Sequence, residues 1–530
     1  MILTIEHILN LVDALPTNVN FDYVSGGKSK AKLISVDKER FRVDIVRVNA
    51  DGTEKNASMT TDILNTLVAH IRENEPFKFD NVLNGSGNVR STMEAIFAHT
   101  TEFYFCKIGR VKHLIWVPRI PHEIGKIVDY NTIKTNVEEY LKDETTIIDR
   151  KYIKHITAIK SKPFLLLAGI SGTGKSRIVR ELARACWVEG SEEYKNPRGK
   201  NFEMVQVKPN WHDSSELIGY VSRVSGSPVF VAGDFLKFVA KAWENPEVPY
   251  FLCLDEMNLA PVEQYFAEYL SVVESRKSQE DGTITTDPIL KKSQEDWYRV
   301  LTSELTNDEG IRTRFLNDGI CIPQNLIVVG TVNMDETTFS FSRKVLDRAM
   351  TIEMNEVDLL SGLDSQYEKI GKLEAGNLIG TAVEGVDIYQ ANKDVCDTAL
   401  KYLEAVNTEL EGTPFKVAYR TRNEFLLYVV NNLPYNKDQD GKEMEQNFVI
   451  ARALDEITSM KILSRIEGDS DKIGNLLNNL QNVIKEQLKA ISNREYSDKK
   501  DDGEKEYSVS LAKLAEMEKR LKSGYTSFWS

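Results

Sequence analysis

The residues best suited to chemistry form one continuous stretch with the spacing G-x-x-x-x-G-K-S: Gly169, Ile170, Ser171, Gly172, Thr173, Gly174, Lys175 and Ser176. This stretch predicts a phosphate-binding loop, because glycines let the backbone curl until several N–H groups face one anion. Lys175 is expected to reach the β and γ phosphates of a nucleotide, and Ser176 to ligate Mg²⁺. Arg177 follows at the start of a helix whose positive N-terminal end would add to the anion site. A glycine-rich turn that binds nothing is the alternative.

The elements that must position this loop follow from the apolar pattern. Runs of apolar residues predict strands at 164–168, 202–207, 250–254 and 325–332. Strands that alternate with helices indicate an α/β fold with a parallel sheet. In such a sheet the active site lies beyond the carboxyl ends of the strands, and the loop follows the first of these strands.

Two further strand ends carry polar residues that suit phosphate chemistry. Asp255 and Glu256 follow the run at 250–254. Asp255 could hold Mg²⁺, and Glu256 could polarise the water that attacks the γ phosphate. Asn333 follows the run at 325–332 and could orient the same water. A solvated strand end or a turn is the alternative for each, so both assignments depend on the loop upstream.

Length and composition limit the class of protein. At 530 residues the chain is long enough for several domains. A formal net charge of −13 argues against a protein that coats nucleic acid through its global charge. The five cysteines lie far apart, as is usual in the reducing cytosol. No apolar run reaches the roughly 20 residues that span a bilayer, so we expect a soluble cytoplasmic protein with no membrane partner.

These motifs together resemble those of the AAA+ NTPases, in the McrB-like branch that is related to MoxR and dynein. The resemblance covers most of the chain from about Tyr152 onward, and the segments that carry it are 169–176, 205–220, 254–276, 330–349, 453–469 and 525–530. It implies a P-loop parallel sheet with a helical lid, preceded by an α+β N-terminal domain. It also implies a ring, usually hexameric, with a nucleotide between neighbouring subunits. Asp255 and Glu256 become the Walker B pair, and Asn333 becomes sensor I.

The ring implied by the resemblance gives roles to several arginines. Arg348, in a Leu-Asp-Arg-Ala segment, is the first choice for an arginine finger that reaches a neighbour's γ phosphate, and Arg343 is the second. Such a finger makes hydrolysis depend on assembly. In the lid, Arg420 is the preferred nucleotide contact of the sensor II region and Arg422 the alternate. The alternatives are a pairing of Arg348 with a nearby acid and a helix-capping role for the lid arginines.

The sensor segment bears on the choice of nucleotide. GTP-specific McrB carries the signature M-N-x-x-D-R, whereas residues 332–337 of this chain read V-N-M-D-E-T. The Asp-Arg pair is missing, which favours ATP, with GTP as the alternative. The loop itself contacts phosphates and metal and does not distinguish bases.

We expect four parts in the chain: an N-terminal recognition or partner domain at 1–145, a large AAA+ subdomain at 146–360, a helical lid at 361–490, and a charged linker with a C-terminal helix at 491–530. Within the large subdomain, Trp211 could contact a substrate or belong to the core. The polar segment at 275–317 is expected to be a solvated loop.

The N-terminal part has a mixed pattern of aromatic and basic residues: Phe103, Tyr104, Phe105, Lys107, Arg110, Lys112 and Trp116. This composition could stack on bases and hold phosphates of DNA. A half-buried strand with basic residues on its wet face gives the same pattern.

The expected function is that of a ring NTPase, the motor subunit of a McrBC-type antiphage or modification-dependent DNA restriction system. No nuclease cluster of acids and lysine is recognisable in the sequence, so a separate McrC-like nuclease subunit would cut. A MoxR-like protein-remodelling chaperone and a nucleotide-gated assembly scaffold are the alternatives. Intact Lys175, Asp255, Glu256 and Asn333 weigh against the scaffold.

Overall fold

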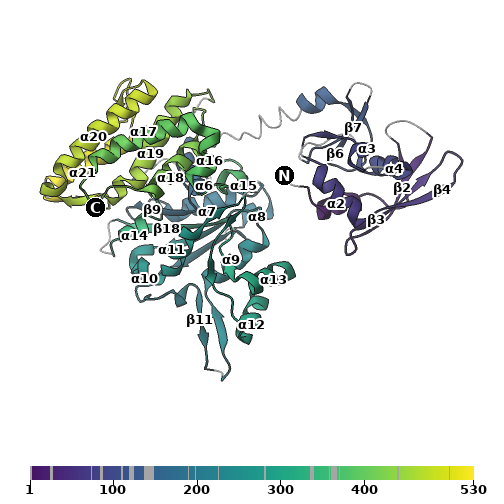
Figure 1. Ribbon diagram of the computed structural model, residues 1–530, viewed down its shortest axis with the longest axis horizontal. Helices are drawn as coiled ribbons and strands as arrows, with labels where there is room; N and C mark the ends of the chain where they lie inside the picture. Colours follow the sequence, from purple (N-terminus) through teal and green to yellow (C-terminus); the bar gives the residue numbers. More distant parts are fainter. Residues whose placement is uncertain are drawn as a thin grey trace. The chain divides into compact units, whose positions relative to one another are not determined.

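The chain divides into two compact units, Met1–Thr146 and Ile147–Ser530, which are described separately as the N-terminal and C-terminal units (Figure 1). The computed structural model describes residues 3–23, 28–72, 74–83, 87–108, 111–118, 124–135, 148–188, 190–196, 199–224, 226–279, 282–334, 339–356, 359, 367–368, 370–438, 441–500 and 502–529. The domain boundaries expected at 145–146 and 360–361 fall outside these ranges.

The N-terminal unit is an α+β module. Four antiparallel strands form its first sheet, in the order β1 (Asn20–Asp22), β2 (Lys30–Asp37), β3 (Arg42–Val48) and β4 (Glu54–Met59). A second sheet has the order β5 (Pro76–Phe77), β7 (Val111–Trp116), β6 (Phe103–Ile108) and β8 (Ile127–Asp129). Helices α1 (Ile5–Asp13), α2 (Thr61–His70), α3 (Phe79–Val82) and α4 (Gly87–Phe97) share one apolar core with both sheets.

The aromatic residues of β6 and β7 belong to the core and are not available to stack on bases. Phe103, Tyr104, Phe105 and Trp116 are each at most 2% exposed. Lys107 and Lys112 are exposed and lie opposite each other in the β6–β7 pair. Arg110 lies outside the described residues. The alternation of aromatic and basic residues therefore reflects a pair of strands with buried aromatic side chains and with basic residues at the solvent-exposed end.

The C-terminal unit is built on a five-stranded parallel sheet. Its order is β10 (Phe202–Gln206), β13 (Tyr250–Asp255), β18 (Leu326–Asn333), β9 (Phe164–Gly169) and β19 (Met350–Glu353). Four of these strands match the predicted runs to within one residue at either end, and β19 was not predicted. All strands run in parallel, so their carboxyl ends meet at one edge.

Alternate side chains of this sheet enter two different cores, as the pleat requires. On one face Leu165 and Leu167 pack with α6 (Arg150–Ser161), α7 (Lys175–Ala185) and the lid. On the other face Phe164 and Leu166 pack with α9 (Asp234–Glu244), α10 (Val262–Tyr265), α11 (Ala267–Val272) and α14 (Arg343–Leu346). Trp211 is 4% exposed within this second core, which settles its role as structural.

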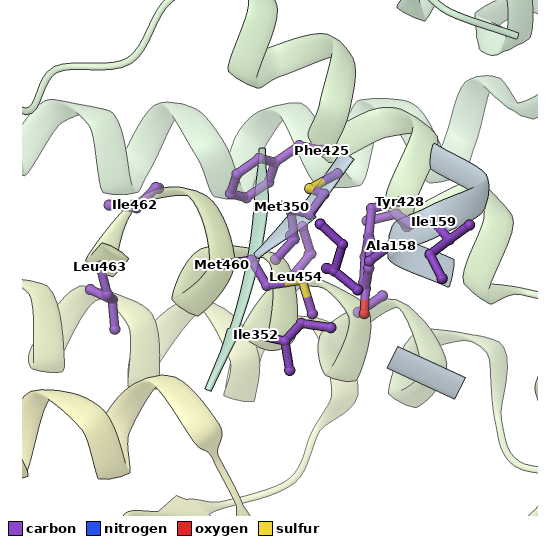
Figure 2. Close-up of a cluster of buried hydrophobic side chains, with 14 of the residues drawn as sticks. Ala158, Ile159, Met350, Ile352, Phe425, Tyr428, Leu454, Met460, Ile462 and Leu463 are labelled. Atoms are coloured by element: carbon purple, nitrogen blue, oxygen red, sulfur yellow. The ribbon is translucent and has the colours of Figure 1, made fainter. Parts of the chain in front are cut away.

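The lid is a helical bundle that shares the first core. Its helices are α15 (Ala375–Leu378), α16 (Gly385–Tyr389), α17 (Lys393–Glu409), α18 (Tyr419–Asn432), α19 (Gln446–Lys461), α20 (Ser470–Ser492) and α21 (Val509–Leu521). Figure 2 shows Phe425 and Tyr428 of α18 beside Ala158 of α6 and Met350 of β19. The lid is thus continuous with α6 and with the edge strand.

The described residues after position 490, 491–500 and 502–529, fold onto the lid. Leu514, Met517 and Phe528 are fully buried in the same core as α19 and α20. The charged run contains two short strands that pair with each other, β21 (Tyr496–Ser497) and β22 (Glu506–Tyr507). The C-terminal strand β23 (Tyr525–Ser527) pairs with β20 (Glu467–Asp469). The last helix therefore docks on its own domain.

Two segments are inserted between strands of the parallel sheet, one between β10 and β13 and one between β13 and β18. The hairpin β11 (Gly219–Ser222) and β12 (Val229–Ala232) projects from the unit in Figure 1. The prediction of a solvated loop at 275–317 is wrong, because the segment forms α12 (Asp296–Leu305) and most of α13 (Glu309–Asp318), anchored by buried Tyr298 and Phe315.

Within the described ranges, no helix is long and apolar enough to cross a membrane.

Candidate nucleotide site

The predicted phosphate loop connects the buried strand β9 to α7 at the carboxyl edge of the sheet. Gly174 has φ +82° at the helix start, a left-handed conformation that favours glycine. A Cβ on Gly169 would lie 2.6 Å from the carbonyl oxygen of Met354, so only glycine allows this close approach. Ile170, Ser171 and Gly172, at the loop's tip, are exposed. The loop therefore has the backbone shape and the access that an anion needs.

The lysine of the loop is bonded to the loop's own backbone, and the serine is bonded to Asp255. Lys175 is 6% exposed, and its Nζ donates to the carbonyl oxygens of Gly169 at 2.9 Å and Ile170 at 2.7 Å. Ser176 Oγ donates to Asp255 Oδ1 at 2.6 Å. A hydroxyl and a carboxylate oxygen thus meet at the mouth of the loop.

Thr331 links these groups to Glu256, and sequence reasoning did not single it out. Its hydroxyl donates to Asp255 Oδ1 at 2.8 Å and accepts from the backbone N–H of Glu256 at 3.0 Å. Glu256 has φ +53°, which is strained for a residue with a side chain. Asn333 Nδ2 donates to Glu256 Oε1 at 3.3 Å. The structure therefore brings Asp255, Glu256 and Asn333 together beside the loop.

Asn355 is a second residue that sequence reasoning missed. Its Oδ1 accepts from the N–H of Ile170 at 2.9 Å, and its Nδ2 donates to Glu353 at 2.6 Å. This contact braces the loop against the end of β19. No motif marks the residue, because its role depends on a contact between positions that are 185 residues apart.

The oxygen ligands at this edge suit Mg²⁺. Magnesium prefers hard oxygen donors and one or two protein ligands together with phosphate oxygens. Ser176 and Asp255 supply such donors 2.6 Å apart, next to the exposed tip of the loop. The residues present therefore fit both a magnesium ion and a nucleoside triphosphate.

The two arginines that were first choices for nucleotide contact, Arg348 and Arg420, do not lie beside the chain's own phosphate loop. Arg348 and Arg420 both contact Glu274: Arg348 Nε lies 3.7 Å from Oε1, and Arg420 Nη2 pairs closely with Oε2. Lys162, the residue two before β9, lies 3.6 Å from the same carboxylate. Since the loop follows the other end of β9, a strand of six residues, this cluster is roughly 20 Å from the chain's own phosphate loop.

The two alternate arginines have other partners within the described residues. Arg343 donates to the carbonyl oxygen of Pro414 at 3.1 Å, and its guanidinium lies 5.3 Å from the centre of the Phe415 ring. Arg422 donates to Asn423 Oδ1 at 3.0 Å and stacks on Tyr419. Both residues are engaged in contacts of the lid.

Comparisons with known proteins bear on this geometry. Residues 164–349 match the family described as "AAA domain (dynein-related subfamily)", and residues 379–525 match a domain of unknown function (DUF8727). The "Type IV methyl-directed restriction enzyme EcoKMcrB subunit" of Escherichia coli (strain K12) is 27% identical over 233 residues, which cover 43% of this chain and 42% of that protein.

A second curated relative is also a restriction protein. The "Type II restriction enzyme NmeDI" of Neisseria meningitidis serogroup C is 31% identical over 144 residues, which cover 24% of this chain and 40% of that protein. The chain thus spans less than half the length of either relative. The solved structure "SCCmec type IV Cch - active helicase" aligns over 94% of this chain and 99% of its own, with 11% identity and a TM-score of 0.22, too low to carry an argument.

The matched domain begins with β9 and ends with Ala349, directly after Arg348 and just before the edge strand β19. The loop, the acidic pair and Asn333 therefore all lie inside it. Its parallel sheet and the similarity to the McrB subunit agree with this placement. Residues 164–349 are therefore a AAA domain of the dynein-related subfamily, and the chain is similar to the McrB subunit over 43% of its length.

Proposed function

We propose that this chain is an ATP-hydrolysing subunit of a homo-oligomeric ring, usually a hexamer in this branch, and that the ring is the motor of a McrBC-type restriction system. The observation that carries the proposal is the division of the site between two edges of one sheet. The phosphate loop and acidic pair lie at the carboxyl edge, and Arg348 lies at the other. A subunit that must receive its arginine from a neighbour works only in an assembly.

At the carboxyl edge, the chain's own groups would hold and activate the reactants. Lys175 and the loop N–H groups would bind the β and γ phosphates, and Ser176 and Asp255 would hold Mg²⁺, which would supply positive charge beside the transferring phosphoryl group. Glu256 accepts a proton from the attacking water, and Asn333 fixes the direction of that carboxylate through its hydrogen bond.

At the opposite edge, Arg348 and Arg420 would act on the nucleotide of the next subunit. Both guanidiniums meet at Glu274, so they would reach a neighbour's γ phosphate together. Charge on the transferring group increases in the transition state, and a cation placed there lowers the barrier. Arg343 contributes less, because its recorded contacts lie within the lid of its own subunit.

ATP is the proposed nucleotide, with GTP as the alternative. Support comes from the sequence, since the Asp-Arg pair of the GTP-specific signature is absent. The positions that would carry that pair, 336 and 337, lie outside the described residues. Hydrolysis of each nucleotide in competition with the other decides between them.

The role in restriction is supported by the two relatives, both of which are named as restriction enzymes. A separate McrC-like nuclease would cut DNA that the N-terminal unit recognises, in the cytoplasm. Lys107 and Lys112 are the exposed cations of that unit's second sheet from which DNA contact is proposed. Buried aromatic residues play no part in it.

The test measures hydrolysis by the full chain over a range of protein concentrations, with and without DNA. We expect turnover per subunit to rise with concentration and DNA to stimulate it. The Lys175→Ala variant, which lacks the phosphate-binding ammonium, is the inactive control. Turnover independent of concentration would contradict a shared site. Absence of both DNA binding and DNA stimulation would refute the restriction role and favour a MoxR-like chaperone.

A further inference from the structure

Glu274 is the common partner of the two arginines that the proposed function places in a neighbour's site. It lies in the turn after α11, with 20% of its side chain exposed. Arg348 belongs to the large subdomain and Arg420 to the lid, yet each contacts one oxygen of this carboxylate. Glu274 lies in the segment 254–276 that carries the resemblance, but its role could not be assigned from the sequence, because its partners are 74 and 146 residues away.

We propose that Glu274 is a positioning residue for hydrolysis in the adjacent subunit, holding Arg348 and Arg420 as one two-pronged cationic group. This inference rests on the proposed function. Glu274 does not touch the reacting atoms; it fixes the guanidiniums that do. A displacement of about 1 Å in such groups can cost roughly 10²-fold in rate.

The contacts leave the arginines able to bind phosphate. Arg348 faces Glu274 with Nε and donates from Nη1 to the carbonyl oxygen of Lys344 at 2.7 Å. Arg420 uses Nη2. A guanidinium has several N–H donors, so each side chain retains donors for phosphate oxygens while one side of it is held.

Charge balance explains why a carboxylate is needed at this position. The cluster contains the cations Lys162, Arg348, Arg420 and Lys461, and the carboxylates Glu274 and Glu424. Among the described residues, the cations joined by these ion pairs outnumber the two carboxylates that they share. Without the charge of Glu274 the guanidiniums would repel each other and Lys162, and the pair would separate.

Two buried ion pairs share Glu424, and one of their lysines, Lys162, also contacts Glu274. Lys162 Nζ lies 2.5 Å from Glu424, and Lys461 Nζ lies 2.7 Å from the same carboxylate. Burial opposes the charge of Glu424, but Lys162 and Lys461 outweigh it, and the pKa of Glu424 lies below its ordinary value. Glu274 is the outermost carboxylate of this chain of ion pairs, where the arginines emerge.

The experiment compares Glu274→Gln with the full wild-type chain, and Glu268→Gln is the control. Glu268 is an exposed carboxylate on α11, outside the cluster. We expect kcat of Glu274→Gln to fall about 10²-fold, with KM and nucleotide affinity unchanged, because the neighbour's binding loop is intact. An unchanged or increased kcat would overturn the proposal.

Mixing two variants shows in which subunit Glu274 acts. Lys175→Ala subunits cannot bind nucleotide but retain Glu274 and both arginines. Placed beside a Glu274→Gln subunit, they should restore hydrolysis at its site, to roughly a quarter of the wild-type rate in random one-to-one rings with independent sites. Failure to restore activity would show that Glu274 acts within its own subunit, and would refute the proposal.

Two further readouts separate folding and function. If Glu274→Gln does not fold, Glu274→Asp keeps the charge and withdraws the carboxylate by one methylene; we expect about a tenfold loss of kcat, and full activity would count against positioning. A wild-type chain without any hydrolysis would refute the proposed function and the positioning role together. An active wild type with active Glu274 variants refutes the positioning role alone.

Discussion

The two edges of the parallel sheet are organised by different forces. At the carboxyl edge, Ser176, Thr331 and Asn333 are joined to Asp255 and Glu256 by hydrogen bonds of 2.6 to 3.3 Å. At the opposite edge, arginines and lysines are joined to two carboxylates by ion pairs. The hydrogen bonds at the carboxyl edge fix the positions of Asp255 and Glu256. The ion pairs at the opposite edge hold positively charged side chains near the surface, where a second molecule could contact them. In the proposed ring, nucleotide binding would be completed within one subunit, whereas catalysis would need the arginines of the next.

The largest effect should come from removing the finger at the arginine edge. We expect Arg348→Ala to lower hydrolysis by about 10³-fold or more, with nucleotide affinity unchanged, because Arg348 is remote from its own loop. Arg343→Ala is the matched control and should stay within about threefold of wild type, since Arg343 contacts its own lid. Steady-state rates and nucleotide titrations measure both. Equal losses of hydrolysis rate in the two variants would contradict the assignment of the finger to Arg348.

The next effect lies at the carboxyl edge. Glu256→Gln removes the proton acceptor for the attacking water and should slow hydrolysis by about 10² to 10⁴-fold. Nucleotide binding should persist, because Lys175 and Ser176 are untouched, and the variant should accumulate bound triphosphate. Rapid filtration of the protein with labelled nucleotide measures this. A variant that turns over at the normal rate would show that another group takes the proton.

A smaller effect should follow from Thr331→Val. The hydroxyl bridges Asp255 and the backbone of Glu256, and its loss leaves two polar groups short of a partner. We expect kcat to fall by about tenfold. Thr351→Val is the control: it is equally buried in β19, but its Oγ1 has no hydrogen-bond partner in the part of the chain that the structure describes. Similar losses of kcat in both variants would show that the hydrogen bonds of Thr331 do not matter for hydrolysis beyond the packing of its side chain.

The smallest effect should arise at Asp455, which contacts the start of the last helix. Buried Asp455 accepts hydrogen bonds from Ser508, Val509 and Ser510 at the start of α21, and burial raises its pKa to about 6. A carboxyl whose pKa is raised by folding stabilises most when protonated, and that stability is lost as pH rises through about 6.

A comparison with the Asp455→Asn variant isolates the pH-dependent contribution of this carboxyl to stability. Relative to the variant, wild type should gain about 1 to 2 kcal/mol of unfolding free energy between about pH 7.5 and pH 5. Hydrolysis at about pH 7.5 should not change, because the hydrogen-bond partners of Asp455 lie at the start of α21 and not in the nucleotide site or the arginine cluster. Denaturant unfolding at the two pH values provides the measurement. A pH-independent difference would contradict the assignment.

The sheet and the loop could be predicted because their signals are local. An apolar run followed by the spacing of glycines, Lys175 and Ser176 specifies a strand, a turn and an anion site within a few residues. Asp255 and Glu256 could be placed because parallel strands end at one edge. The strand β19 escaped prediction, since its four residues are too few to show a pattern.

The residues that escaped prediction act through contacts that sequence spacing does not encode. Thr331, Asn355 and Glu274 each find partners more than 70 residues away. Arg420 was expected to contact nucleotide, and the structure puts it beside Arg348 at the edge opposite its own loop. Its position depends on how the lid packs on Lys162 and Glu274, which only the assembled core determines.

Lys461 gives the turn that carries Arg348 a mechanical connection to the lid. From the end of α19 its Nζ donates to the carbonyl oxygens of Leu346, Asp347 and Ala349, at 3.2, 3.0 and 2.8 Å. These three hydrogen bonds tie the turn to the lid. In the proposed ring, a lid that tilts as its own nucleotide changes would advance or withdraw the arginine in the next site. Signals between subunits would therefore travel around the ring in one rotational sense only.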